Sequence, residues 1–228
     1  METKNVEGEN SFEEKKIFKK PKDSNLTKKG FYIFVAVFLL LVVVFLFNLM
    51  TPAPDLISFF IGLSALWGYI FLTAASIMTP FLKEVLRYMG KPFIKIHHIF
   101  AFTGLSLITL HPILISARDM TLKVFVPDFT TWISFWTLAG RPALYVIWIA
   151  FLVILFRRKI KPWRIIHAFM FLSLLMGFIH AILSGTDFKN MGIIIIYSIL
   201  FILVITSFVL KRMQLIKARN QKAKKIKI

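Results

Sequence analysis

Four of the five histidines in this chain form two widely spaced pairs, each inside a long apolar run. His97 and His111 are fourteen residues apart, and His167 and His180 are thirteen apart. Because a helix rises about 1.5 Å per residue, each pair spans roughly 20 Å along its helix. An imidazole in hydrocarbon is costly unless something binds it, so paired intramembrane histidines indicate a functional site. The pattern favours haem iron, with two haems stacked across one membrane.

His98 is an alternative to His97, since it lies thirteen residues from His111. Adjacent residues point about 100° apart on a helix, so only one of the two can face a helix bundle. We favour His97, because its fourteen-residue step returns to within roughly 40° of the face of His111. Thirteen residues leave His180 roughly 140° from His167 on a straight helix, so that helix must be locally tightened, tilted, or approached by the two porphyrins from different flanks.

The composition determines the class of protein that must position these side chains. Hydrophobic residues make up 57% of the 228 positions, which predicts an integral membrane protein. Cysteine is absent, which excludes disulfides, iron–sulfur clusters and thiolate-ligated haem. The formal charge of +18 comes from cations at the termini and between the apolar runs. This distribution indicates that the cations contact membrane lipid and set the membrane topology. It does not indicate a nucleic-acid partner.

Apolar windows long enough to cross a bilayer predict an all-α, polytopic membrane bundle of six transmembrane helices. The predicted spans are Phe31–Met50, Leu56–Met78, Phe93–Ser116, Pro142–Phe156, Trp163–Leu183 and Ile193–Leu210. The fourth is the weakest and is expected to begin nearer Trp136, after an interfacial loop over residues 122–134. We divide the chain into a basic tail (1–30), an extra N-terminal anchor (31–55), a histidine-bearing bundle (56–210) and a second basic tail (211–228).

The distribution of cations predicts the orientation. Of 29 Lys and Arg residues, 25 lie before the first span, around the second-to-third and fourth-to-fifth connections, or after the sixth span. The positive-inside rule therefore predicts a multi-pass protein of the cell membrane with both termini in the cytoplasm. The third and fifth helices then run parallel, so His97 faces His167 near the cytoplasm and His111 faces His180 near the outside.

Intramembrane histidines also have roles that involve no haem. A single one is usually a hydrogen-bonded core residue, but four in register do not fit that role. A small transporter or channel could use histidines to move protons or metal ions, although none of the six spans contains the Asp or Glu that such a path would favour. For haem propionates, Arg164 is the inner candidate and Arg141 the outer one; otherwise these arginines bind lipid phosphate or define topology.

The segments that carry the histidines resemble the ferric reductase-like transmembrane domain, a superfamily that includes ferric reductases, NADPH oxidases and the haem-binding membrane subunit of bacterial methionine sulfoxide reductase. The resemblance covers about residues 59–183. Its motifs are GLSALW at 62–67, HHIFAFTGLSLITLH at 97–111, WRIIH at 163–167 and GFIH at 177–180. NADPH oxidases similarly use a fourteen-residue step on one helix and thirteen on the other, which supports His97 over His98.

This resemblance implies two b-type haems, ligated by His97 with His167 and by His111 with His180, that pass electrons across the bilayer. The chain ends eighteen residues after Leu210 without a Gly-rich nucleotide loop, so we expect the haem-carrying membrane component of an oxidoreductase. The expected donor is a separate flavin reductase, a quinol, or FMN or FAD at the cytoplasmic face. The expected acceptor is an extracytoplasmic redox partner, ferric iron or oxygen.

Overall fold

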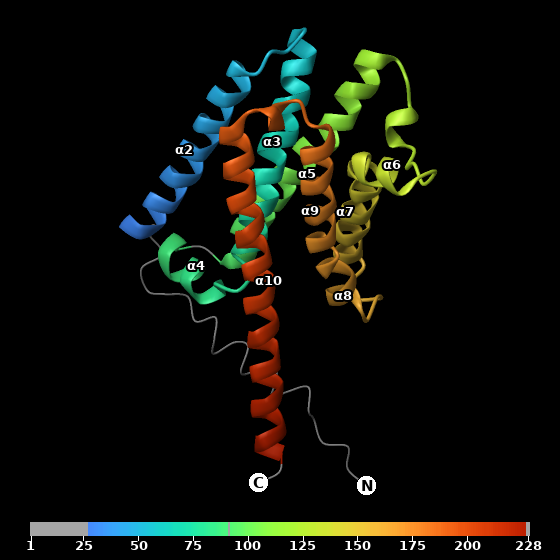
Figure 1. Cartoon of the computed structure of the whole chain (residues 1–228). Helices are drawn as coiled ribbons and strands as arrows, with labels where there is room; N and C mark the ends of the chain where they lie inside the picture. The colour runs from blue at the N-terminus through green and yellow to red at the C-terminus, as the bar shows by residue number, and fades with distance from the viewer. Residues whose placement is uncertain (1–26, 91, 227–228) are drawn as a thin grey trace.

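The computed structural model describes residues 27–90 and 92–226, whose regular elements are helices (Figure 1). In chain order they are α2 (Lys28–Met50), α3 (Leu56–Ile77), α4 (Leu82–Met89), α5 (Phe93–Asp119), the 3₁₀ turn η1 (Lys123–Phe125), α6 (Trp132–Thr137), α7 (Gly140–Leu155), α8 (Trp163–Ala168), α9 (Met170–Ser184), the 3₁₀ turn η2 (Asp187–Lys189) and α10 (Met191–Ile226). Five segments are long and apolar enough to cross a membrane: α2, α3, α5, α8 with α9, and α10. The chain is thus an all-helical, multi-pass membrane protein.

The predicted fourth span differs from the others in length. It corresponds to α7, which has 16 residues and is shorter than the roughly 20 residues that cross hydrocarbon. The apolar residues before it form the separate helix α6, which begins inside the predicted interfacial loop. Thr131 starts α6 because its hydroxyl accepts a hydrogen bond from the Ser134 N–H at 3.0 Å in a capping box. The described residues therefore contain five helices long enough to cross a membrane and one shorter apolar helix, α7, at the place of the predicted fourth span.

The fifth predicted span is interrupted near its N-terminal end. The N–H of Phe169 donates to the carbonyl of Ile166, three residues back, at 3.0 Å. This tight turn separates α8 from α9. A 3₁₀ turn has three residues per turn and therefore rotates the chain by about 120° per residue, more than an α-helix does. The interruption lies between His167 and His180, so the two histidines are not on one straight helix.

Helix α3 lies at the centre of the bundle and packs against α5, α2, α10 and α9. Its contact with α5 is close because two glycines meet it. A Cβ at Gly104 would lie 2.8 Å from the backbone nitrogen of Leu72, and one at Gly68 would lie 2.9 Å from that of Ile108. No larger residue fits either position without moving the helices apart. The two glycines thus fix α3 against the helix that carries His97 and His111.

The N-terminal segment 31–55 forms most of α2, which docks on the bundle. The indole N–H of Trp67 on α3 donates to the carbonyl of Leu41 at 3.2 Å. At the start of α2, the Thr27 N–H and hydroxyl both donate to the carbonyl of Tyr88 on α4. The predicted N-terminal tail lies mostly outside the described residues, since it covers positions 1–30 and the description begins at 27.

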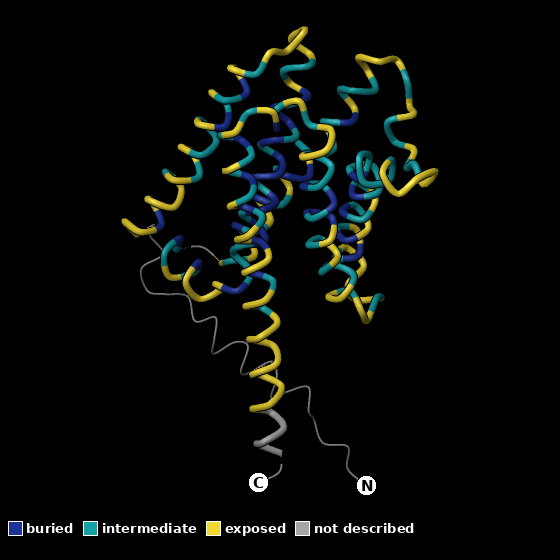
Figure 2. Tube along the Cα trace, in the orientation of Figure 1, coloured by how far each residue is buried: buried dark blue, intermediate teal, exposed yellow. Residues whose placement is uncertain are grey.

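Helix α10 continues straight past the other helices (Figure 1). The segment 211–226, predicted as a separate tail, is part of this 36-residue helix. Figure 2 shows buried residues gathered where α3, α5, α9 and α10 meet and exposed residues along the far part of α10. The basic end of α10 therefore continues the last apolar helix without a break.

Candidate functional site

The first pair of histidines that the structure brings together is His97 on α5 and His167 on α8. Their ring centroids lie 6.4 Å apart and the ring planes are at 80° to each other. Two metal–imidazole bonds of about 2 Å each, together with the half-widths of two rings, give a separation of roughly this size. The ring of Phe93 stacks on His97 at 5.2 Å. The two imidazoles are therefore spaced so that one metal centre could lie between them.

The second pair, His111 on α5 and His180 on α9, lines a cavity of about 510 Å³. Gly140, at the start of α7, lies directly against one ring, because a Cβ there would be 2.6 Å from Cδ2 of His180. Gly177 on α9 also lines the cavity and has no atom within 4 Å of the position its Cβ would take. Glycine at position 140 therefore leaves space for the His180 ring, and glycine at position 177 leaves space in the cavity.

All four histidines share one hydrogen-bonding arrangement, in which Nδ1 faces a backbone carbonyl. The acceptors are Ala75 for His97 at 3.1 Å, Ile61 for His111 at 2.9 Å, Ala150 for His167 at 3.0 Å and Thr137 for His180 at 2.6 Å. A carbonyl oxygen only accepts, so each Nδ1 must carry the proton. Each Nε2 is then left with a free lone pair. This tautomer, fixed by the carbonyl, is the one that a metal-binding histidine uses.

His98 has different surroundings from its neighbour. It is exposed, and its ring forms no hydrogen bond with the residues that the structure describes. His97 is half-buried, is held by the Ala75 carbonyl and faces His167. Of the two adjacent histidines, His97 is thus the one placed opposite a second imidazole, and His98 lies on the outer surface of α5.

The two arginines predicted for propionates lie in different places. Arg141 lines the cavity, and its Nη1 donates to the carbonyl of Val126 at 2.8 Å. This bond uses one of its five N–H groups and holds the guanidinium in the cavity that His111 and His180 also line. Arg164 is exposed and stacks on the indole of Trp163 at 5.1 Å. It therefore lies at the surface near the start of α8.

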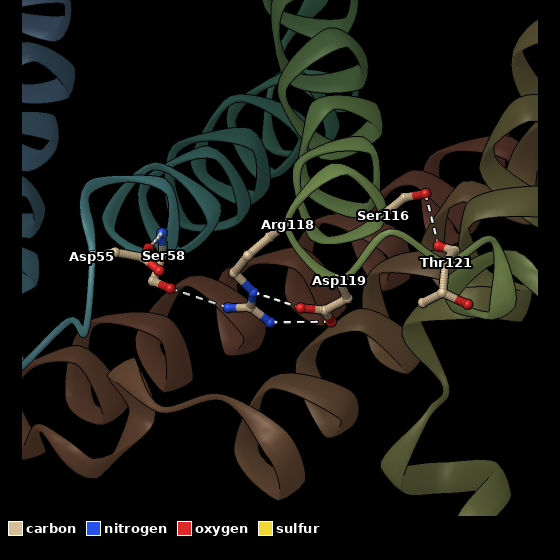
Figure 3. A network of polar contacts seen from close by, with 6 residues as sticks. All are labelled: Asp55, Ser58, Ser116, Arg118, Asp119 and Thr121. Carbon is tan, nitrogen blue, oxygen red and sulfur yellow. Dashed lines mark hydrogen bonds and ion pairs between the residues drawn. The ribbon is translucent and has the colours of Figure 1, made fainter.

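Two charged residues of the cavity were not singled out from the sequence. Arg118 bridges α3 and α5 at the cavity rim, where it donates to Ser58 at 3.1 Å and pairs with Asp119 at 2.8 Å (Figure 3). In the same network the N–H of Ser58 donates to Asp55, and this bond lowers the pKa of that carboxyl. Asp187 on η2 lines the cavity from the other side, and burial raises the pKa of its carboxyl. Its only sequence signal is that it is the sole acid between the last two predicted spans.

The chain has no match among protein-family models, curated proteins or solved structures. Among residues 27–90 and 92–226, no three His, Asp or Glu side chains gather closely enough to hold a metal ion. The candidate site therefore rests on its own geometry: two pairs of imidazoles at two levels along α5, whose Nε2 atoms form no hydrogen bond with residues 27–90 or 92–226.

Proposed function

We propose that this protein transfers electrons across a membrane through two b-type haems, one held by His97 and His167 and the other by His111 and His180. The observation that carries the proposal is the common orientation of the four imidazoles. Each gives its Nδ1–H to a backbone carbonyl and keeps Nε2 for iron, which is the arrangement of bis-imidazole ligation. The resemblance of these motifs to the ferric reductase-like transmembrane domain agrees with it.

Haem iron with two axial imidazoles supplies reversible one-electron transfer. The protein's contribution is to hold the rings, since a carbonyl on each Nδ1 keeps the tautomer fixed and raises the basicity of the ligating nitrogen. The 6.4 Å between the rings of His97 and His167 supports the inner site, and the cavity beside His111 and His180 supports the outer one. The guanidinium of Arg141 is placed to pair with a carboxylate in that cavity.

The membrane arrangement that we propose has six crossings, with α6 and α7 together forming the fourth. The 16 residues of α7 reach about 24 Å, and α6 extends the apolar path towards the interface. Both termini lie in the cytoplasm because 25 of the 29 cations fall on that side. Electrons then enter at His97 and His167 and leave at His111 and His180, roughly 21 Å away along α5.

The chain needs partners at both ends of this path. We propose a separate flavin reductase carrying FMN or FAD, or a quinol, as the cytoplasmic or membrane donor. The acceptor is an extracytoplasmic redox partner or ferric iron. Neither partner is identified by the residues that the structure describes, so the proposal concerns the path between them.

The first test is an absorption spectrum of the protein purified after expression with ample haem. We expect two low-spin b-type haems, seen as a split Soret band and an α band that sharpens on reduction. A folded but colourless protein would refute the proposal. The variant His98→Ala is the matched control for His97→Ala, because it removes an adjacent, exposed imidazole and should keep both haems.

The second test concerns direction. In inside-out vesicles, NAD(P)H and an added flavin reductase should reduce the haems, and reoxidation should need an acceptor in the lumen. If an impermeant acceptor confined to the cytoplasmic face drained the outer haem faster, the proposed orientation or electron path would be wrong.

A further inference from the structure

The cavity beside His111 and His180 has one acidic side chain among its lining residues, Asp187. Asp187 is the first residue of the 3₁₀ turn η2, between α9 and α10. It is half-buried, and its carboxyl forms no ion pair with any residue of 27–90 or 92–226. A half-buried carboxyl without a cation is costly in its charged form, so its proton affinity depends strongly on other charges in the cavity.

The carboxyl of Asp187 lies close to the backbone that holds one of the histidines. A Cβ at Gly62 on α3 would be 2.7 Å from Oδ2 and 3.2 Å from Oδ1 of Asp187, so the carboxyl lies directly against this helix. The residue before Gly62 is Ile61, whose carbonyl faces Nδ1 of His111 at 2.9 Å. Asp187 and His111 therefore contact adjacent residues of α3.

The turn that carries Asp187 is anchored by the residue after it. Phe188 is 6% exposed, and its ring packs on Tyr197 at 5.3 Å and on Phe178 at 6.5 Å. Thr186, the residue before Asp187, is exposed and also lines the cavity. A buried aromatic ring thus holds the carboxyl in the cavity, and its other neighbour in the chain is open to water.

The charges around the cavity determine how Asp187 responds to an electron. Arg118 is paired with Asp119 and Arg141 donates to a backbone carbonyl, and neither forms an ion pair with Asp187. Burial raises the pKa of the Asp187 carboxyl above its ordinary value, because water solvates the ionised form better. The other charged or titratable groups that line the cavity, or share the turn of Asp187, are His111 and Arg118 on α5, Arg141 on α7, His180 on α9, Tyr69 on α3, Tyr197 on α10 and Lys189 on η2.

We propose that Asp187 takes up one proton from water when an electron reaches the proposed outer site, and releases that proton when the electron leaves. This inference rests on the proposed function, because it needs a redox group between His111 and His180. An added electron makes the cavity more negative by one charge, and the Asp187 carboxylate offsets that charge by binding the proton on one of its oxygens. The electron comes from the donor already proposed, and both the electron and the proton leave when the acceptor oxidises the site.

The test measures the midpoint potential of each haem in the haem-loaded full chain between about pH 4 and pH 9. In the wild type, the potential of the outer haem should fall by up to about 59 mV per tenfold decrease in proton concentration, the value for one proton per electron. Asp187→Asn should abolish this slope, because an amide does not take up the proton. The inner haem is the reference in each sample, since the cavity of Asp187 is not lined by the inner histidines.

Asp128→Asn is the matched control. Asp128 accepts hydrogen bonds from Thr130 in the loop before α6 and does not line the cavity, so this variant should keep the slope of the wild type. A potential of the outer haem that does not change with pH in the wild type would overturn the proposal. So would a slope that survives in Asp187→Asn.

A measurement on the wild type alone keeps the proposal testable if Asp187→Asn does not fold. Infrared difference spectra should show the C=O stretch of a protonated carboxyl that appears on reduction. A heavy carbon isotope in the side-chain carboxyl of aspartate should shift this band to lower frequency, which separates an aspartate from glutamates and from haem propionates. The absence of the band, or a band that the label leaves unchanged, would overturn the proposal.

The same samples separate this proposal from that of electron transfer. Two haems with a pH-independent outer potential would overturn the role of Asp187 and leave the haem proposal intact. A folded protein that binds no haem would overturn both.

Discussion

The two histidine pairs, His97 with His167 (the proposed inner pair) and His111 with His180 (the proposed outer pair), use the same hydrogen-bonding arrangement in different surroundings. In the inner pair, His97 is covered by the stacked ring of Phe93 and has a second histidine, His98, beside it. In the outer pair, His111 and His180 line a cavity of about 510 Å³ that also includes Arg141 and Asp187. The lining of this cavity does not include the inner histidines.

The comparison teaches that different parts of the chain set the tautomer of the histidines and the space beside them. The ligand chemistry comes from backbone carbonyls of neighbouring helices, which act on each Nδ1 in the same way at both depths. Access comes from glycines and connecting loops at one end of the bundle, because Gly62, Gly140 and Gly177 leave space there. We therefore expect the two pairs to respond alike to loss of a ligand and differently to changes in the cavity.

The largest expected effect is loss of a ligand. If the proposed two haems are bound, His180→Ala should lower the haem per chain by about half and leave the inner site occupied, because only the outer site loses a ligand. Pyridine haemochrome assays and the reduced spectrum would measure this. His97→Ala should remove the inner haem instead. Equal loss of all haem from every single variant would point to one site or to collapse of the bundle.

A cavity glycine gives the next largest effect. Gly140→Ala places a Cβ 2.6 Å from Cδ2 of His180 and should displace that ring, with an overpacking cost of about 1 to 3 kcal/mol. Gly177→Ala is the matched control for the unfolding temperature, because nothing lies within 4 Å of its Cβ position. Thermal unfolding and the spectrum of the outer haem are the measurements. Equal behaviour of the two variants would contradict the contact between Gly140 and His180.

The pH dependence of stability should differ between two loop acids. Burial raises the pKa of Asp187, so its neutral form is favoured in the folded protein. The stability that it contributes is present below the unfolded value, near 4, and is lost as pH rises through the raised pKa. Asp187→Asn should therefore flatten the fall in unfolding temperature with rising pH in that window.

Asp128 is the control with the opposite sign. The N–H and hydroxyl of Thr130 both donate to its carboxylate and lower its pKa. Its contribution is present above the unfolded value and is lost as pH falls through the lowered pKa. Asp128→Asn should therefore change the acid side of the profile, below about 4. Identical profiles for the two variants would show that these loop acids do not titrate as their surroundings imply.

The smallest effect concerns the arginines. Arg141→Gln removes a positive charge beside the outer pair and should lower the midpoint potential of the outer haem by a few tens of millivolts, about 1 kcal/mol. Arg164→Gln, which changes an exposed residue stacked on Trp163, should shift neither haem as much. Potentiometric titration of both variants would measure the two shifts. A larger shift for Arg164→Gln than for Arg141→Gln would contradict the placement of Arg141 beside the outer haem.

The long apolar runs made most of the helices predictable. The run predicted over Leu56–Met78 forms α3, Leu56–Ile77, and the run over Phe31–Met50 lies within α2. Hydrophobic length is a local property, so it can be read from one sequence. The fourth span, predicted over Pro142–Phe156, forms the short helix α7, but the expectation that it begins nearer Trp136 was not met, because a break after Thr137 separates α6 from α7.

The histidines themselves could be found from their spacing, but their surroundings could not. The carbonyl that holds His111 lies 50 residues away at Ile61, and the one that holds His180 lies 43 residues away at Thr137. Such contacts depend on how the helices pack, which spacing along one helix does not encode. The same holds for Asp187, whose carboxyl lies against Gly62 on α3, a residue far away along the chain.

The length of α10 determines where its charge acts. Its 36 residues extend about 54 Å, whereas the hydrocarbon of a bilayer is about 30 Å thick. A helix that begins at one interface therefore ends roughly 24 Å beyond the other. Electrostatic attraction to lipid phosphates decays over a Debye length of about 8 Å at physiological salt. The field of this basic end thus falls mainly on ions and macromolecules dissolved in the adjacent water, and it weakens there as salt is added.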